Sequence, residues 1–169
     1  ICAAALVARE GALSPELCKA IWQGRRRPRG HLFPQSLMAH AGFVEAGAFR
    51  YARVVRIAVR PERQGTGLGT EFIETLSQHY SSLGMDCLCT SFGASEPLMR
   101  FWQGGGFSMA RLGVKPEAST GEIAAMMVKS LSNQAISFVE NLHRRFVMNM
   151  KIEHALNIRE LSTPPSLEQ

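Results

Sequence analysis

The feature that most constrains this chain is a strand, a glycine-rich loop and a helix that follow one another directly between Val54 and Tyr80. Alternating β-branched residues predict the strand, which Pro61 ends because proline cannot donate to a sheet ladder. Three glycines follow at alternate positions: Gly65, Gly67 and Gly69. Apolar side chains then recur at helical spacing, at Leu68, Phe72, Leu76 and Leu83. The loop therefore lies at a helix N-terminus, where unpaired amide groups and the helix dipole favour a phosphate or pyrophosphate.

The spacing of the glycines narrows the choice of phosphate-binding loop. A Walker loop needs Gly-Lys followed by Ser or Thr, and none follows here. A dinucleotide fingerprint needs a glycine at its sixth position, which is Thr70 when counted from Gly65. The remaining pattern, Gln64-x-x-Gly67-x-Gly69 after a strand, resembles the acetyl-CoA loop of the GCN5-related N-acetyltransferase (GNAT) superfamily. The alternative interpretation is a glycine-rich turn that binds no ligand.

This resemblance implies acetyl-CoA as the cofactor and assigns residues to it. The end of the strand matches the main chain that pairs with the pantetheine arm, over Ile57, Ala58 and Val59. The loop and the first helical turn match the pyrophosphate site, over Gln64, Gly65, Thr66, Gly67, Leu68, Gly69 and Thr70. A backbone N–H of the strand is then expected to polarise the thioester carbonyl.

Length and composition set the broad class. At 169 residues the chain forms one domain, or one domain with a tail, and because it does not begin with Met we expect a fragment of a longer protein. No apolar run approaches the roughly 20 residues of a membrane span, so no membrane partner is expected. Cysteine spacing gives no metal site and indicates buried free thiols in the reducing cytoplasm, at Cys2, Cys18, Cys87 and Cys89.

A second feature is a run of four arginines within five residues: Arg25, Arg26, Arg27 and Arg29. Gly24 and Gly30 bound the run and Pro28 interrupts it, so we expect an exposed loop. Arginine offers a bidentate fork to phosphates, and the net charge of +5 favours a polyanionic partner. We expect this arginine loop, together with His31, to contact RNA. A solvated basic turn or a contact to CoA phosphates is the alternative, and no aromatic residue within the loop indicates base stacking.

The other elements follow an α/β pattern around one sheet. Further strands are predicted at residues 2–8, 85–92, 107–112 and 122–128, and helices at residues 14–23, 34–41 and 96–103. The strand at 2–8 is expected to be buried, and the last two strands to pair antiparallel. After Asn133 a helical apolar stripe is predicted, over Ile136, Val139, Leu142, Phe146 and Met150. This stripe either packs on the body or is a docking face for other parts of a longer protein. We therefore divide the chain into an acetyltransferase domain at 1–130, a helical extension at 131–162 and a disordered tail at 163–169.

Several stretches together resemble the acetyltransferase module of the tRNA(Met) cytidine acetyltransferase family, which makes N4-acetylcytidine. They are Glu10-Gly11-Ala12-Leu13-Ser14, Arg26-Arg27-Pro28-Arg29-Gly30-His31-Leu32, Gln35-Ser36-Leu37, Arg56-Ile57-Ala58-Val59, Gln64 to Gly69, Ser91-Phe92-Gly93, Arg100-Phe101-Trp102-Gln103 and Gly106-Phe107. The glycine loop alone indicates only the superfamily. The arginine loop and the two aromatic stretches are much more specific, and the resemblance extends from about residue 6 to about residue 130.

The family resemblance implies a GNAT fold with a mixed central sheet flanked by helices and followed by a C-terminal helical tail. It implies transfer of acetyl from acetyl-CoA to N4 of a cytidine in tRNA, the anticodon wobble base of elongator tRNA-Met. Family members also carry an ATP-dependent helicase-like module before this region. Because this chain has no Walker loop, ATP is expected only through a module outside it.

At two positions the chain departs from its relatives. Many of them have His after Ile-Ala-Val as a proton acceptor, where this chain has Arg60, which stays protonated. Many superfamily members have a tyrosine in the later helix to protonate the leaving thiolate, and Trp102 stands at that position. We therefore assign no catalytic residue.

Two other functions stay open, and so does the oligomeric state. One is acetyl transfer to a protein or a small amine, which the excess of arginine near the acceptor side disfavours because it repels cationic amines. The other is a non-catalytic module that binds CoA or RNA, which the missing His and Tyr favour.

Overall fold

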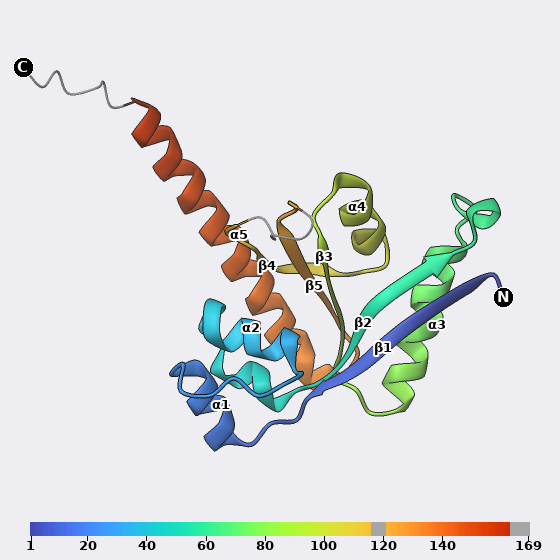
Figure 1. Ribbon diagram of the computed structural model, residues 1–169, viewed down its shortest axis with the longest axis horizontal. Coiled ribbons are helices and arrows are strands. Elements are labelled where there is room, and N and C mark those ends of the chain that lie inside the picture. Colours follow the sequence, from blue (N-terminus) through green and yellow to red (C-terminus); the bar gives the residue numbers. More distant parts are fainter. Residues whose placement is uncertain (116–120, 163–169) are drawn as a thin grey trace, which may run out of the picture.

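The computed structural model describes residues 1–115 and 121–162, and contains one five-stranded sheet in the order β1-β2-β3-β5-β4 (Figure 1). The strands are β1 (Ala3–Gly11), β2 (Arg50–Val59), β3 (Cys87–Gly93), β4 (Ser108–Leu112) and β5 (Ala124–Ser130). The helices are α1 (Pro15–Trp22), α2 (Leu32–Ala41), α3 (Leu68–Ser82), α4 (Glu96–Gly104) and α5 (Asn133–Ser162), with short 3-10 helices η1 (Val44–Ala48) and η2 (Pro61–Arg63).

The sheet is mixed, as predicted. β2 and β3 are parallel, whereas β1–β2, β3–β5 and β5–β4 are antiparallel pairs. The predicted antiparallel pairing of the last two strands is therefore confirmed. A parallel pair needs a crossover connection, and α3 supplies it between β2 and β3.

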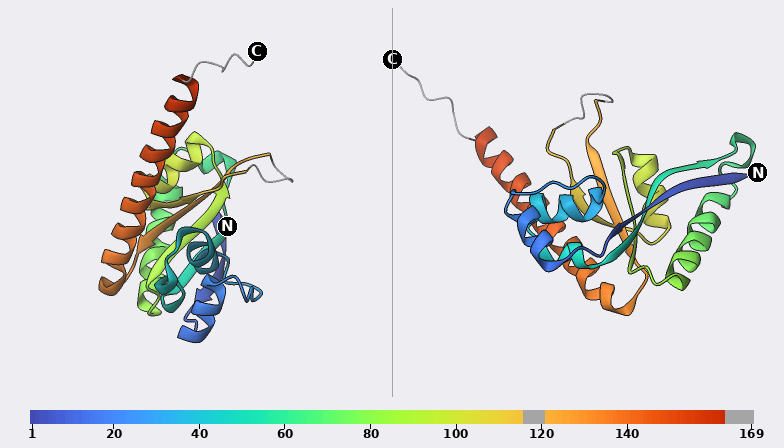
Figure 2. Two further views of the ribbon diagram at one scale, coloured as in Figure 1. Left: turned by 90° about the vertical axis from the view of Figure 1, so that its left-hand side faces the viewer. Right: turned by 60° about the horizontal axis from the view of Figure 1, so that its bottom comes forward.

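The pairing of β2 with β3 covers only part of either strand. It extends from Tyr51 and Cys87 to Val54 and Thr90. Beyond these residues β2 continues with β1, while β3 continues with β5. The two pairs of strands diverge into a V, with α4 beside its open end (Figures 1 and 2).

Each face of the sheet carries its own apolar core. Alternate strand residues such as Tyr51, Cys89 and Val128 pack with α1, α2 and the start of α5. Their neighbours, such as Val54, Leu88 and Met127, pack on the other face with α3 and α4. This alternation follows from the two-residue period of a strand, and it places α3 and the α1–α2 pair on opposite faces.

The helix boundaries agree closely with the sequence pattern. Ser14 caps α1, because its hydroxyl accepts a hydrogen bond from the Leu17 amide at 3.3 Å. Helix α2 begins at Leu32, two residues before the predicted start at Pro34. Helix α3 begins at Leu68 as predicted, although its fully buried side chains are Ile73 and Ser77.

The prediction that residues 2–8 form a buried strand is wrong in its burial. β1 pairs with β2 alone and is an edge strand, so its side chains alternate between half-buried and exposed and Leu6 is 58% exposed. Cys2 is likewise exposed, whereas Cys18, Cys87 and Cys89 are buried free thiols as predicted. None of the described helices is long and apolar enough to cross a membrane.

Helix α5 packs on the body with its first turns, and its last turns project away from it (Figure 1). Its buried residues are Ala135, Phe138, Val139 and Leu142. The predicted helix is therefore confirmed, and of its apolar stripe Val139 and Leu142 are buried whereas Ile136 and Met150 are exposed. The division at residue 130 stays a prediction, and the predicted disordered tail at 163–169 lies outside the described residues.

Asp86 joins the start of α5 to the sheet. Its carboxylate accepts hydrogen bonds from the Arg50 amide at 2.9 Å, from the Ser132 hydroxyl at 2.8 Å and from the Gln134 side chain. Burial pushes the pKa of Asp86 upward, but these donors outweigh burial and hold its pKa below the ordinary value. The first turn of α5 is therefore held beside the N-terminal ends of β2 and β3.

We expect Leu142→Ala to lower the free energy of unfolding by about 2–5 kcal/mol, because Leu142 is 1% exposed and leaves a cavity. Ile136→Ala, on the same helix and 43% exposed, is the control and should cost less than about 1 kcal/mol. Urea unfolding measures both. Equal effects would contradict the packing of α5 described here.

Candidate active site

The glycine-rich loop has the backbone geometry of an anion-binding turn. Gly65 and Gly67 have φ values of +72° and +87°, a left-handed conformation that favours glycine. A Cβ added at either glycine would meet no atom within 4 Å, so the surface above them is open to a ligand. The Gln64 side chain donates to the Val59 carbonyl at 3.0 Å and joins the loop to the end of β2. The Thr66 hydroxyl donates to the Arg63 carbonyl at 2.7 Å.

The loop ends at the N-terminus of α3, where backbone donors are available. The N-cap residue is Gly67, so no side chain caps the helix. The first intrahelical bond at this end runs from the Glu71 amide to the Gly67 carbonyl, which leaves the amides of Leu68, Gly69 and Thr70 free of such a bond. These amides and the positive end of the helix dipole form a site for an anionic group.

The second part of the site is the unpaired edge of β2. Beyond Val54, alternate amide and carbonyl groups of β2 point away from β1 and toward the gap of the V. The pairing with β1 also shifts register here, because Leu6 opposes Arg56 and Val7 opposes Val54, which leaves Val55 as a bulge. Ile57, Ala58 and Val59 therefore lie on a free strand edge that leads to the glycine loop.

Thr90 closes the narrow end of the V, a role that the sequence pattern did not indicate. Its hydroxyl is buried and donates to the Val54 carbonyl at 3.2 Å. The bond marks the last contact between β2 and β3. A threonine on a buried strand is common, so only the pairing register distinguishes this one.

Helix α4 supplies the wall beside the loop. An added Cβ at Gly69 would lie 2.9 Å from a ring carbon of Phe101 and 3.7 Å from Val59, so these three residues pack together. Trp102 is buried, and its ring contacts those of Phe92, Phe101 and Phe107. The position that holds tyrosine in many superfamily members thus has a packing residue here.

Arg60 is exposed at the end of β2. Its Nε lies 3.4 Å from a carboxylate oxygen of Glu62, and its amide donates to the Cys2 carbonyl at 2.9 Å. An exposed guanidinium remains charged, so Arg60 adds positive charge beside the glycine loop and is not a base.

The arginine loop is exposed, as predicted, and is fixed by hydrogen bonds. The amides of Arg25 and Arg26 donate to the Ala20 carbonyl at 2.8 and 3.2 Å. His31 is half-buried, and its Nδ1 accepts a hydrogen bond from the Gly11 amide at 2.9 Å. The His31 ring therefore also joins the start of α2 to the end of β1.

The structure does not bring the arginine loop and the glycine loop together. They lie toward opposite ends of β2, the arginine loop beside α1 and α2 and the glycine loop beside α3 (Figures 1 and 2). The free edge of β2 from Val54 to Val59 spans about 17 Å at roughly 3.3 Å per residue. An extended ligand on this edge therefore has its phosphates at one end and its other end near the narrow part of the V.

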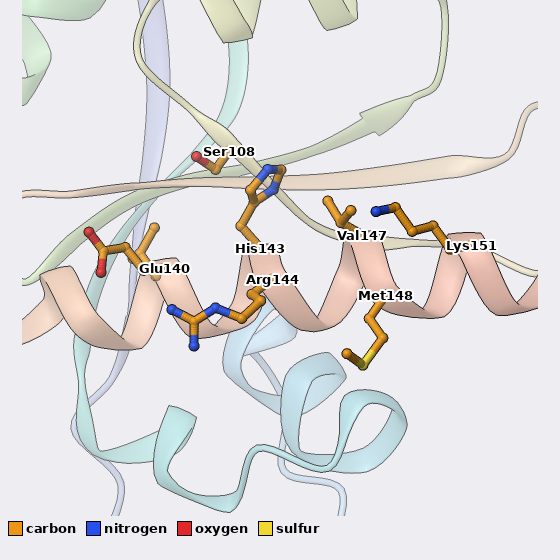
Figure 3. A pocket seen from close by; sticks show the side chains of 8 residues that line it. Ser108, Glu140, His143, Arg144, Val147, Met148 and Lys151 are labelled. Carbon is orange, nitrogen blue, oxygen red and sulfur yellow. The ribbon is translucent and has the colours of Figure 1, made fainter.

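A separate hollow of about 470 Å³ lies along α5 and contains none of the predicted site residues. Figure 3 shows His143 pointing from α5 toward β4, where Ser108 lies. The His143 Nδ1 is 3.1 Å from the Met109 carbonyl. This hydrogen bond joins α5 to the edge strand and accounts for the histidine. Among the described residues, no group of three or more His, Cys, Asp or Glu side chains is arranged to hold a metal ion.

Comparison with known proteins decides the family. The family model described as GNAT acetyltransferase 2 matches residues 1–86 and 81–132, which is more than half of the chain. The chain belongs to the GNAT acetyltransferase 2 family. The matched residues include the arginine loop, the free edge of β2 and the glycine loop.

Curated relatives of this GNAT chain are similar over most of its length. It is 40% identical over 161 residues to "tRNA(Met) cytidine acetyltransferase TmcA" of Nitrosococcus halophilus, a match that covers 95% of this chain and 22% of that protein. It is 43% identical over 136 residues to the protein of the same name from Salmonella typhimurium, with 80% and 20% covered. The chain therefore spans about a fifth of the length of these relatives.

Solved structures agree with the fold. An agmatine N-acetyltransferase matches with a TM-score of 0.50 and 18% identity, over 77% of this chain and 71% of that one. The polyamine N-acetyltransferase of Drosophila melanogaster also has a TM-score of 0.50, with 17% identity over 77% and 69%. At this identity the likeness establishes the GNAT fold alone.

The conformation of Gly67 gives a test that needs no ligand. Gly67→Ala should lower the free energy of unfolding by about 1–2 kcal/mol, because an L-residue is strained at φ +87° although space is open. Gly104→Ala is the control, since Gly104 lies in α4, has open space and has no positive φ. It should be neutral or stabilising by up to about 1 kcal/mol. Urea unfolding of both variants checks this, and a neutral Gly67→Ala would contradict the loop geometry.

Proposed function

We propose that this chain is an acetyl-CoA-dependent N-acetyltransferase module that acetylates N4 of a cytidine in tRNA. The observation that carries the proposal is the free edge of β2, which leads directly into an uncapped helix N-terminus. An acyl-CoA needs both parts, because its pantetheine amides pair with a strand edge and its pyrophosphate binds backbone amides. Membership of a family described as acetyltransferases agrees with this assignment.

The cofactor residues are those assigned from the sequence. Ile57, Ala58 and Val59 offer main-chain groups to the pantetheine arm, and the loop from Gln64 to Thr70 receives the pyrophosphate. Arg60 precedes η2 and Arg63 is its last residue, and both add positive charge beside the loop. Bound acetyl-CoA supplies an activated acetyl thioester at the far end of this groove.

The acceptor is inferred from the curated relatives and from charge. Both relatives compared above are named as tRNA(Met) cytidine acetyltransferases. The exposed arginines Arg25, Arg26, Arg27 and Arg29 present positive charge on the α1–α2 side, which favours RNA and repels cationic amines. His31 lies at the end of this loop and completes the proposed RNA contact surface.

The reaction depends more on how the cytidine and the thioester are positioned than on a strong general base. The N4 nitrogen of cytidine is neutral and a weak nucleophile, so the chain must hold the base beside the thioester and exclude competing water. A backbone N–H of β2 stabilises negative charge on the carbonyl oxygen as attack proceeds. The N4 proton passes to bulk solvent after attack, because the guanidinium of Arg60 has no acceptor site for it. The thiol of CoA has an ordinary pKa near 8.5, so its thiolate leaves without a protein acid.

The proposal places the chain in the cytoplasm, where its four free cysteines stay reduced. ATP enters only through the helicase-like module that the family resemblance implies. The domain division at residues 130 and 162 belongs to the same proposal.

The first test is calorimetric titration of acetyl-CoA into the wild-type chain and the variants Gly67→Ala and Gly67→Glu. Gly67→Glu places a carboxylate where phosphates approach, so it should weaken binding at least about tenfold beyond Gly67→Ala, which carries only the backbone strain. Radiolabelled acetyl transfer to tRNA should then yield N4-acetylcytidine.

Three results would contradict the proposal. Equal affinity of Gly67→Glu and Gly67→Ala would place the cofactor elsewhere or nowhere. Binding with transfer only to peptides or polyamines would support the protein or small-amine acetyltransferase, and binding without any transfer would support a non-catalytic module.

A further inference from the structure

A hollow of about 460 Å³ lies between α1, α2 and the arginine loop, and we call it the α1–α2 pocket. The residues that matter for its chemistry are Trp22, Arg27, Leu32, Gln35, His40 and Arg53. Its volume is within the range of roughly 300–1,000 Å³ that small-ligand sites occupy. The sequence pattern gave no sign of it, because these residues come from four separate segments: α1, the arginine loop, α2 and β2.

The rim of the α1–α2 pocket carries an aromatic side chain beside the arginines. Trp22 is the last residue of α1 and is 51% exposed. Leu32, at the start of α2, is also exposed. An exposed indole next to guanidinium groups is typical of a platform on which an unpaired base stacks. The arginine loop therefore does have an aromatic neighbour in space.

The lining of the α1–α2 pocket includes cationic side chains and no acidic residue. Burial, followed by the charges of Arg111 and Arg27, lowers the pKa of His40, which places this imidazole among cations. Arg53 lies behind them, and its Nε is 2.7 Å from a carboxylate oxygen of Glu10. That carboxylate also accepts the Phe33 amide at 2.8 Å and is buried. The open side of the pocket therefore favours an anion.

The α1–α2 pocket is held in shape before any ligand binds. The side-chain amide of Gln35 donates to the Pro28 carbonyl at 2.8 Å and also to the Gly30 carbonyl. These two bonds fasten the arginine loop to α2. A fixed loop loses little conformational freedom on binding, which favours affinity.

The location of Arg53 connects this pocket to the active site. Arg53 precedes Val54, the last residue of β2 that pairs with β3. Since Ala52 and Val54 pack on the face covered by α3 and α4, the side chain of Arg53 lies on the opposite face. The pocket thus opens beside the narrow end of the V, where the far end of an extended cofactor lies.

We propose that the α1–α2 pocket binds an unpaired nucleotide of the acceptor RNA, with its base stacked on Trp22 and its phosphate held by Arg27 and His40. This inference rests on the proposed function and specifies how a nucleotide beside the reacting cytidine is bound. A stacked neighbouring base holds the RNA strand in register, which is the positioning that a weak nucleophile requires.

The test uses the 169-residue chain and a cytidine-rich single-stranded RNA oligonucleotide with a fluorescent label, followed by anisotropy. Trp22→Ala should weaken binding about tenfold or more, given the usual cost of losing a base–aromatic stack. Trp22→Phe keeps a ring and should stay within about threefold of wild type. Arg27→Glu should also weaken binding about tenfold and lower its salt dependence. Arg144→Glu makes the same charge change at an exposed arginine of α5 outside this pocket, and should have little effect.

Tryptophan fluorescence gives a second readout. The chain has two tryptophans, and Trp102 is buried, so quenching by cytidine monophosphate reports on Trp22. We expect quenching in the wild type and none in Trp22→Phe.

Equal RNA affinity of Trp22→Ala and wild type, or no RNA binding by the wild type, would contradict the proposal that the α1–α2 pocket binds RNA. Acetyl-CoA titration of the same samples separates the two levels of the account. If acetyl-CoA still binds to these samples, only the proposed RNA binding in the pocket is contradicted, and the proposed cofactor site is retained. If the wild type binds neither RNA nor acetyl-CoA, the proposed function fails with it.

Discussion

The parting of β2 from β3 after Val54 and Thr90 is the constraint on which the rest of the site depends. Had the two strands stayed paired, every backbone group of β2 would have been satisfied inside the sheet, and no edge would be free for a ligand. Two features lie where the strands part: the bulge at Val55 in β2, and the hydrogen bond from the Thr90 hydroxyl to the Val54 carbonyl. The glycine loop and the α1–α2 pocket lie on either side of this point.

The glycine loop and the arginine loop both supply positive charge, but from different kinds of group. At the glycine loop it comes from backbone amides and the dipole of α3, a fixed field that costs no reorganisation. At the arginine loop it comes from long side chains, whose contacts are screened by salt. The first kind is adapted to a cofactor with one defined geometry, and the second to an extended polyanion. Buried Trp102 and exposed Arg60 agree with a mechanism that relies on positioning and backbone polarisation.

The sequence predicted those features that depend on local pattern. The order strand, loop and helix between Val54 and Tyr80 and the exposed arginine loop both follow from neighbouring residues. The apolar stripe of α5 does not identify the buried face at Ile136, because Ala135 occupies the buried position there. Hydrophobicity alone does not choose between adjacent faces of a helix. The sequence does not distinguish edge strand β1 from a buried strand, because its small apolar residues are compatible with either position. Two features were not predictable from the sequence: the V between β2 and β3, and the presence of Trp22 and His40 in one pocket. Both depend on how distant segments of the chain pack together.

The most direct test of this account is an amide NMR spectrum of the chain recorded during titration with acetyl-CoA. The account predicts that the largest shifts fall on two groups of amides, those of Val55 to Val59 on the free edge of β2 and those of Gln64 to Thr70 at the glycine loop. The paired segment from Tyr51 to Val54 should change less. Shifts confined to the loop, or centred on α5, would contradict the claim that the parted strands form the cofactor groove.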